Sequence, residues 1–317
     1  MRAGWSHDTA TPAVRRISTG GSYDARVDAP QWFDDALAAP RVEDEVIVDG
    51  CPVHYIRWGA RDCPGIVLVH GGAAHAHWWD HVAPLLTRGC CVVALDLSGH
   101  GDSGRRDGYP TTTWAQEIVE VARHAGIEGS PLVVGHSMGG WVAITAAAEY
   151  GDGLDGIVIL DSPVSRRAPE EEAAATGVAF GPLRTYETLE AALARFRTVP
   201  DQPTSLPYVL DHVARTSVRK VEGGWTWKFD PRIFDRPMPT GELLRRVRCR
   251  VALFRSEFGL VSPDTGEYMY EQLGRLAPVV EVPLAHHHVM LDQPIPLVTG
   301  LRTLLADWDH SVPQRRS

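Results

Sequence analysis

A serine between two glycines is the pattern in this 317-residue chain that is best suited to chemistry. Residues 135–139 read GHSMG, after an apolar run at 131–134 and before a stretch of small residues at 141–150. G-x-S-x-G at a strand-to-helix turn holds the serine hydroxyl clear of the backbone, and the glycines leave room for the neighbouring strand and helix. The pattern predicts Ser137 as a nucleophile, with His136 beside it as a substrate-binding residue.

A second glycine-rich turn could complete an anion site beside this serine. Residues 70–73 read HGGA and follow the apolar run 66–69. Backbone N–H groups in such a turn, and at the start of a helix, can stabilise a negatively charged oxygen that forms on a reacting carbonyl. We expect the N–H groups of Met138 and Gly72 to form this oxyanion hole, with the Ala73 N–H as the alternative to Gly72.

A nucleophilic serine needs a histidine base, and that histidine needs a carboxylate to orient it. Three adjacent histidines, residues 286–288, follow the last predicted strand, at 279–282. Two carboxylates stand after strands and could serve as the acid: Asp161, and Glu257 as its alternative. Three consecutive side chains cannot all face one ion, so we expect no metal site. Catalysis by a serine, a histidine and a carboxylate needs no cofactor, and we expect none.

The apolar runs predict the elements that must position these residues. Continuous runs are typical of strands covered on both faces, and they lie at 66–69, 91–95, 132–134, 157–160 and 251–254. A hairpin is expected at 46–58, and helices near 78–86, 113–125, 141–150, 264–276 and 295–308. This alternation predicts an α/β fold with a mainly parallel sheet between layers of helices.

The run of strands stops between residues 162 and 248. An insertion of this length within an α/β sheet is typically a lid over the site. We therefore expect a mobile N-terminal arm at residues 1–30, a core domain formed by 31–161 and 249–317, and a cap at 162–248. Within the cap, Trp225 and Trp227 are expected to bind substrate.

Composition limits the partners and the compartment. The formal net charge of −9 argues against nucleic acid as a partner. The five cysteines are scattered and show no C-x-x-C spacing, which favours a reducing compartment. We find no apolar run of membrane-spanning length and no signal peptide, so we expect a cytoplasmic protein that does not bind membranes. A homodimer is left open.

Together these motifs resemble the α/β-hydrolase family. The resemblance runs from about residue 46 to 307 and rests on residues 70–72, 96–103, 135–139 and 287–294. It implies an α/β-hydrolase fold, a serine nucleophile and an inserted helical cap. Related sequences carry the base seven residues before a proline, and Pro294 then selects His287. The acid usually follows the resumed strand, where this chain has Gly259; some members place it where Asp161 stands, which favours Asp161 over Glu257.

The resemblance also implies a function. We expect a serine hydrolase that cleaves a small-to-medium, largely apolar carboxylic ester or lactone through an acyl-enzyme. The partner would be a small-molecule substrate. Two alternatives use the same three side chains: hydrolysis of a C–C bond in a diketone-type substrate, and perhydrolysis. A third alternative is a member of the fold that binds a ligand without catalysis.

Overall fold

The computed structural model describes residues 28–167, 182–235 and 238–310. The arm expected at residues 1–30 lies outside the described residues except for 28–30. Within the described ranges, no helix is both long and apolar enough to cross a bilayer.

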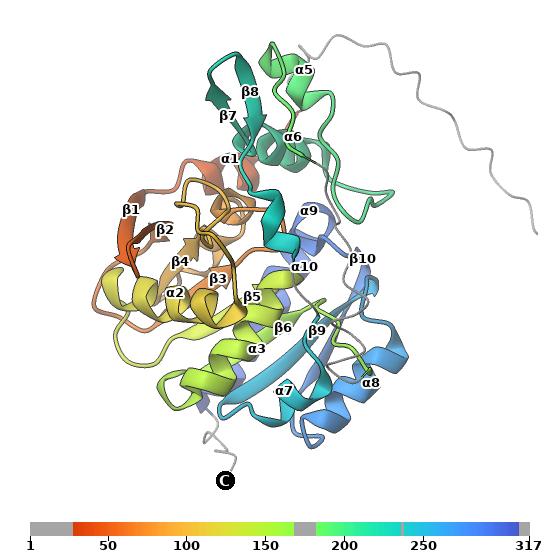
Figure 1. Ribbon diagram of the computed structural model, residues 1–317. Coiled ribbons are helices and arrows are strands. Elements are labelled where there is room, and N and C mark those ends of the chain that lie inside the picture. The colour runs from red at the N-terminus through yellow and green to blue at the C-terminus, as the bar shows by residue number, and fades with distance from the viewer. Residues whose placement is uncertain (1–27, 168–181, 236–237, 311–317) are drawn as a thin grey trace, which may run out of the picture.

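One eight-stranded sheet forms the centre of the molecule (Figure 1). Its strand order is β1-β2-β4-β3-β5-β6-β9-β10. The first two strands form an antiparallel hairpin, β2 also pairs antiparallel with β4, and the remaining pairings are parallel. The predicted mainly parallel sheet is confirmed. Its strands are β1 (Arg41–Val48), β2 (Cys51–Trp58), β3 (Gly65–Val69), β4 (Cys91–Leu95), β5 (Leu132–His136), β6 (Gly156–Leu160), β9 (Arg250–Phe258) and β10 (Val279–His286).

The continuous apolar runs reflect burial of the strands on both faces. Successive side chains of a strand point to opposite faces. In β3, Val67 and Val69 pack into the apolar cluster that includes α2 (Thr111–His124) and α3 (Met138–Tyr150). Ile66 and Leu68 pack into a second cluster, which includes α10 (Pro294–His310). Each strand of this kind therefore supplies two separate cores.

The prediction of one helix near residues 78–86 is wrong. Two short 3₁₀ helices stand there, η1 (Ala76–Trp79) and η2 (Ala83–Leu86). Pro84 has no N–H to donate to a helix bond, so a continuous α-helix is interrupted at this point. The other short helices of the sheet region are α1 (Gln31–Leu37), η3 (Gly151–Gly153), α8 (Pro263–Gln272) and α9 (Val289–Asp292).

The segment expected to form the cap holds helices and a small hairpin. Its described elements are α5 (Leu189–Leu193), α6 (Pro207–Thr216), β7 (Val218–Val221), β8 (Gly224–Trp227), η4 (Pro231–Phe234) and α7 (Gly241–Arg245). Figure 1 shows α5, α6, β7 and β8 gathered together at the top of the molecule. Residues of α5, α6 and β7 form a small apolar cluster of their own. The sequence analysis expected a helical cap here; it did not anticipate α6, η4, α7 or the β7–β8 hairpin.

Candidate active site

Ser137 occupies the sharp turn between β5 and α3. Its backbone has φ 53° and ψ −121°, a conformation that residues other than glycine rarely adopt. The two glycines of the motif are required because neighbouring backbone lies too close to each of them for a side chain. A Cβ on Gly139 would lie 2.5 Å from the carbonyl oxygen of His70, and a Cβ on Gly135 would overlap the backbone of Gly139. The spacing of the two glycines therefore reflects the close approach of Gly139 to the end of β3 and of Gly135 to the start of α3.

Three side chains from distant parts of the chain form one hydrogen-bonded series. Ser137 Oγ lies 2.9 Å from His287 Nε2, and His287 Nδ1 lies 2.7 Å from Asp161 Oδ2. Asp161 follows β6 and His287 follows β10, so all three stand beyond the carboxyl ends of parallel strands. Ligands of open α/β sheets bind at this edge. The structure therefore brings together the three residues that the sequence analysis favoured.

Backbone N–H groups hold the Asp161 carboxylate in place. This carboxylate is fully buried and accepts hydrogen bonds from the N–H groups of Leu260 at 2.8 Å, Val261 at 3.2 Å and Ser256 at 3.3 Å. A buried carboxylate is tolerated only when such donors replace water. These contacts leave Oδ2 aligned on the His287 imidazole.

The alternative acid, Glu257, has a different partner. Its carboxylate accepts a hydrogen bond from the N–H of Leu284 at 2.7 Å. The position where the family pattern expects an aspartate is Gly259, and a Cβ built there would overlap the carboxylate of Asp161. The Asp161 carboxylate thus fills the space of the missing side chain, and it is Asp161 rather than Glu257 that contacts His287.

The histidines on either side of His287 are held apart from Ser137. His286 Nδ1 lies 3.0 Å from Asp292 Oδ2 and 2.9 Å from Thr204 Oγ1. His288 Nε2 donates to the carbonyl oxygen of Pro200 at 3.1 Å. Only the middle residue of the triplet reaches the nucleophile.

His136, expected to bind substrate, is instead buried and does not line the pocket beside Gly72 and Ala73. Its Nε2 donates to the carbonyl oxygen of His287 at 2.8 Å. Burial, reinforced by the neighbouring imidazoles of His287 and His288, lowers the pKa of His136 well below its ordinary value. Burial and the same His287 ring lower the pKa of His288 to about 3. Both rings are therefore neutral near pH 7.

The two segments expected to form the oxyanion hole are neighbours of Ser137. A Cβ on Gly71 would lie 3.2 Å from Ser137 Cβ, and one on Gly72 would lie 3.6 Å from Met138 Sδ. Met138 is the first residue of α3, and the first N–H groups of a helix have no acceptor within it. A Cβ on Gly72 would also lie 2.7 Å from the ring of Phe234, a neighbour that no sequence motif indicated.

A pocket of about 230 Å³ opens beside Gly72 and Ala73. Trp227 lines it as expected, whereas Trp225 packs against the apolar cluster of α5, α6 and β7 and pairs its backbone with Tyr186. The sequence analysis missed the segment from Arg195 to Val199, because its place depends on how the inserted segment folds. The other lining residues are Trp78, Ser217, Phe229 and His288.

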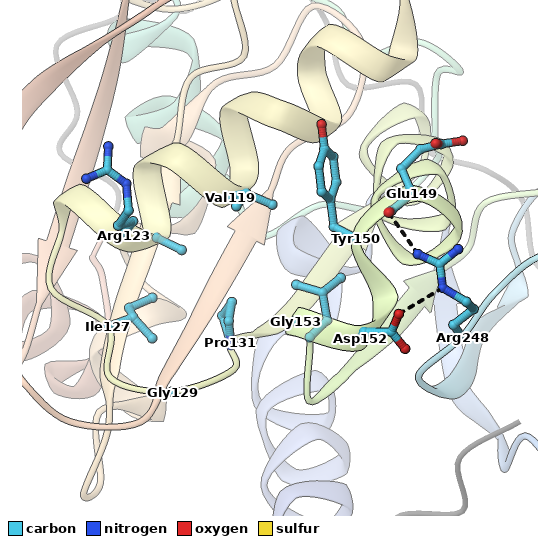
Figure 2. Close-up of a pocket in the computed structure, with 12 residues that line it drawn as sticks. Val119, Arg123, Ile127, Gly129, Pro131, Glu149, Tyr150, Asp152, Gly153 and Arg248 are labelled. Atoms are coloured by element: carbon cyan, nitrogen blue, oxygen red, sulfur yellow. Dashed lines mark hydrogen bonds and ion pairs between the residues drawn. The ribbon is translucent and has the colours of Figure 1, made fainter.

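A larger pocket of about 400 Å³ lies at the opposite edge of the sheet (Figure 2). It is lined by the ends of α2 and α3 and by the loops that precede β5 and β6. Figure 2 shows Arg248 donating to the Glu149 carbonyl oxygen at 2.8 Å and paired with Asp152 at 3.4 Å. Its lining residues lie at the amino ends of β5 and β6, away from Ser137, whereas the smaller pocket includes Gly72 and Ala73 of the turn beside Ser137.

Comparison with known proteins agrees with this architecture. Residues 66–299 match the Alpha/beta hydrolase family. The chain belongs to that family. The fold and the family resemblance inferred from the sequence are confirmed.

Individual relatives include enzymes that act on esters. The chain is 28% identical to esterase Rv0045c of Mycobacterium tuberculosis, over 79% of this chain and 85% of that protein. It is 30% identical to the bifunctional esterase/perhydrolase DCH of Acinetobacter calcoaceticus, over 47% of this chain and 54% of that protein. In fold it is similar to the thioesterase domain from the curacin biosynthetic pathway, with a TM-score of 0.70, 22% identity, and 83% and 99% of the two chains covered. These relatives support a hydrolase that acts on esters.

Proposed function

We propose that this α/β hydrolase cleaves small-to-medium, largely apolar carboxylic esters or lactones through an acyl-enzyme on Ser137. One observation carries the proposal: the hydrogen-bonded series from Ser137 Oγ to His287 at 2.9 Å and from His287 to Asp161 at 2.7 Å. Similarity to the M. tuberculosis esterase supports an ester as the substrate class.

Acylation follows from this arrangement. The Ser137 oxygen attacks the ester carbonyl while His287 Nε2 takes its proton, and Asp161 stabilises the imidazolium through Nδ1–H. The N–H groups of Met138 and Gly72 bind the oxyanion, with Ala73 as the alternative second donor. When the tetrahedral intermediate collapses, the C–O bond to the alkoxide breaks and His287 returns the proton to the departing oxygen.

Deacylation reverses the roles of the same groups. Water loses a proton to His287 Nε2 as its oxygen attacks the acyl carbonyl. The second tetrahedral intermediate then breaks its bond to the Ser137 oxygen, which recovers the proton from His287. A carboxylic acid is released and the free enzyme is restored.

The pocket supports an acyl group of limited size. Its volume of about 230 Å³ is below the roughly 300–1,000 Å³ that is usual for drug-sized ligands. Its walls carry the apolar side chains of Phe196, Val199 and Trp227. A short or medium apolar chain would displace water from these side chains.

Turnover of p-nitrophenyl esters tests the proposal. Ser137→Ala is expected to lower kcat by about 10⁴–10⁶, because the nucleophile and its base act as a unit. Ser130→Ala is the matched control, since Ser130 is exposed and precedes the other end of β5. Equal turnover by the two variants would contradict the proposal. If all esters are inert and a vinylogous diketone is cleaved, the C–C alternative is correct.

Perhydrolysis is a second candidate, favoured by the similarity to the esterase/perhydrolase of Acinetobacter calcoaceticus. In this reaction, hydrogen peroxide replaces water as the attacking group, and the acyl-enzyme is released as a peroxy acid. Ester turnover in the presence of peroxide should then yield peroxy acid in proportion to the peroxide concentration. Formation of carboxylic acid alone would reject this second activity.

A further inference from the structure

The pocket beside Gly72 carries positive charge at its lining. Two of its lining residues are arginines, Arg195 and Arg197, and no aspartate or glutamate of the described ranges lines it. The whole chain, in contrast, has a formal net charge of −9. His288 also lines the pocket, but it is neutral near pH 7 because burial and the His287 ring lower its pKa to about 3. The local excess of positive charge therefore belongs to the two arginines.

Neither guanidinium is neutralised by a carboxylate of the residues that the structure describes. Arg197 Nη1 donates to the carbonyl oxygen of Phe196 at 2.6 Å, which places this group against a residue of the pocket wall. The Arg195 side chain makes no hydrogen bond or ion pair within the described ranges. Both arginines are exposed as well as lining the pocket, so they stand at its rim. Both can therefore pair with an anion that enters from solvent.

The arginines and the reacting groups come from different parts of the fold. Gly72 and Ala73 belong to the turn beside Ser137, whereas the arginines follow α5 in the inserted segment. Figure 1 shows α5 at the top of the molecule and the sheet below it. Apolar side chains also line this pocket, namely Phe196, Val199 and Trp227. An acyl chain whose carbonyl lies at Gly72 can therefore lie along apolar walls and end near positive charge.

We propose that this pocket selects esters whose acyl chain ends in a carboxylate, that is, monoesters of short aliphatic dicarboxylic acids. The inference rests on the proposed function, because it names the acyl group that is transferred to Ser137. A cleft that is lined by one sign of charge and has apolar walls focuses its field and concentrates a substrate of the opposite charge. An arginine can also hold a carboxylate through two parallel N–H···O bonds. Hydrolysis by the steps given above then releases the alcohol and a dicarboxylate.

Three ethyl esters of equal chain length test this selectivity: the monoester of adipic acid, the ester of hexanoic acid and the ester of ε-aminocaproic acid. Their acyl chains end in a negative, a neutral and a positive group. Combining Arg195→Gln with Arg197→Gln should lower kcat/KM for the adipate monoester by roughly fivefold for each arginine, the upper end for exposed ion pairs. The loss should appear in KM rather than kcat, because the contact is made equally in the bound substrate and the transition state. The hexanoate ester should be unaffected, and added NaCl should raise KM for the adipate monoester alone.

A second double variant controls for the overall charge of the chain. Arg88→Gln with Arg184→Gln removes two positive charges from exposed arginines that do not line this pocket. It should handle all three esters as the native chain does, and circular dichroism verifies the fold of both double variants. An equal loss in the two double variants, or an unchanged preference in the Arg195 and Arg197 pair, would overturn the inference. A preference for a carboxylate only on the alcohol, as in the acetate ester of γ-hydroxybutyric acid, would overturn the acyl placement.

Ser137→Ala separates this inference from the proposed function. This variant keeps the pocket, so a ligand-observed NMR titration should show that it binds the intact adipate monoester, and more weakly once both arginines are replaced by glutamine. Turnover of the hexanoate ester by the native chain without an arginine-dependent preference for the adipate monoester would refute the inference alone. A native chain that is inert toward every ester, while Ser137→Ala still binds the monoester through the arginines, would instead refute the esterase proposal.

Discussion

At the scale of single residues, the position of the acid is the feature that distinguishes this site. The Asp161 carboxylate fills the space that a side chain at position 259 would occupy, and three backbone N–H groups hold it there. The sequence analysis left the choice between Asp161 and Glu257 to a resemblance. The decision depends on which oxygen reaches His287 Nδ1, and no local pattern encodes that distance.

The backbone suits an exchange of the acid between the two positions. Asp161 has φ 46°, a conformation that glycine adopts without strain, and Gly259 is not among the residues with positive φ. Asp161→Gly alone should lower kcat by about 10⁴, as expected when the base loses its orienting carboxylate. Adding Gly259→Asp should recover at least a tenfold part of that loss.

Steady-state kinetics on a p-nitrophenyl ester measure this exchange. Glu257→Gln serves as the control, because Glu257 bonds to the Leu284 N–H instead of to His287. A double variant that is no more active than Asp161→Gly would show that position 259 cannot supply the acid. Loss of activity in Glu257→Gln alone would reassign the acid to Glu257.

At the scale of elements, the sequence predicted the strands in which every residue is buried. β3, β4, β5 and β6 appear in the sequence as continuous apolar runs because both faces of each strand are covered. The short elements of the inserted segment, residues 162–248, could not be predicted from the sequence. α5 has five residues and β7 and β8 have four each, too few for a period to stand out. The predicted boundaries at 161/162 and 248/249 stay predictions.

A buried carboxylate ties the inserted segment to the sheet region. Asp80 Oδ2 accepts from His77 Nδ1 at 2.9 Å and from His212 Nε2, on α6, at 3.0 Å, and it pairs with Arg41 at 3.2 Å. Burial alone would raise the pKa of Asp80, but the bonds from His212 and His77 hold it below its ordinary value. Removing one partner of such a buried group leaves the others unpaired.

Asp80→Asn should therefore lower the free energy of unfolding by about 3–5 kcal/mol. Asp102→Asn is the control: it removes a second contact with the inserted segment, the 2.6 Å pair with Lys228, but the Asp102 side chain is 42% exposed. An exposed pair is worth no more than about 1 kcal/mol. Urea unfolding of both variants measures the two free energies of unfolding. If both variants lose the same amount, the buried Asp80 contacts contribute no more to stability than the exposed pair does.

At the scale of the whole molecule, reactivity depends on global folding. Ser137 and His287 are 150 positions apart in the chain, and only the assembled sheet puts them in contact. Several buried histidines make that assembly sensitive to acid. His81 is fully buried and donates to the Met290 carbonyl, and burial lowers its pKa to about 4.

Stability should decline as the pH falls below about 6.5. The folded pKa of His81 lies below the value of about 6.5 in the unfolded chain, so the unfolded chain binds more protons between pH 6.5 and 4. The stabilisation is fully present above pH 6.5 and is lost on acidification. Between pH 7.5 and pH 5, His81 alone should account for about 2 kcal/mol.

Urea unfolding at pH 7.5 and at pH 5.0 tests this linkage. His81→Gln keeps a side-chain donor but no longer titrates, so the difference between the two pH values should shrink by about 2 kcal/mol. The two proteins are compared by the change in their free energy of unfolding between the two pH values. The absolute values are not compared, because the substitution also changes packing. An unchanged slope would show that His81 is not the group responsible.

Covalent labelling tests the central claim most directly. A fluorophosphonate reacts only with a serine whose hydroxyl is activated, and peptide mass spectrometry identifies the residue that carries the phosphonyl group. We predict one label per chain, on Ser137, formed at least about a hundredfold more slowly in His287→Gln because the base is absent. A label on another residue, or an equal rate in His287→Gln, would contradict the account.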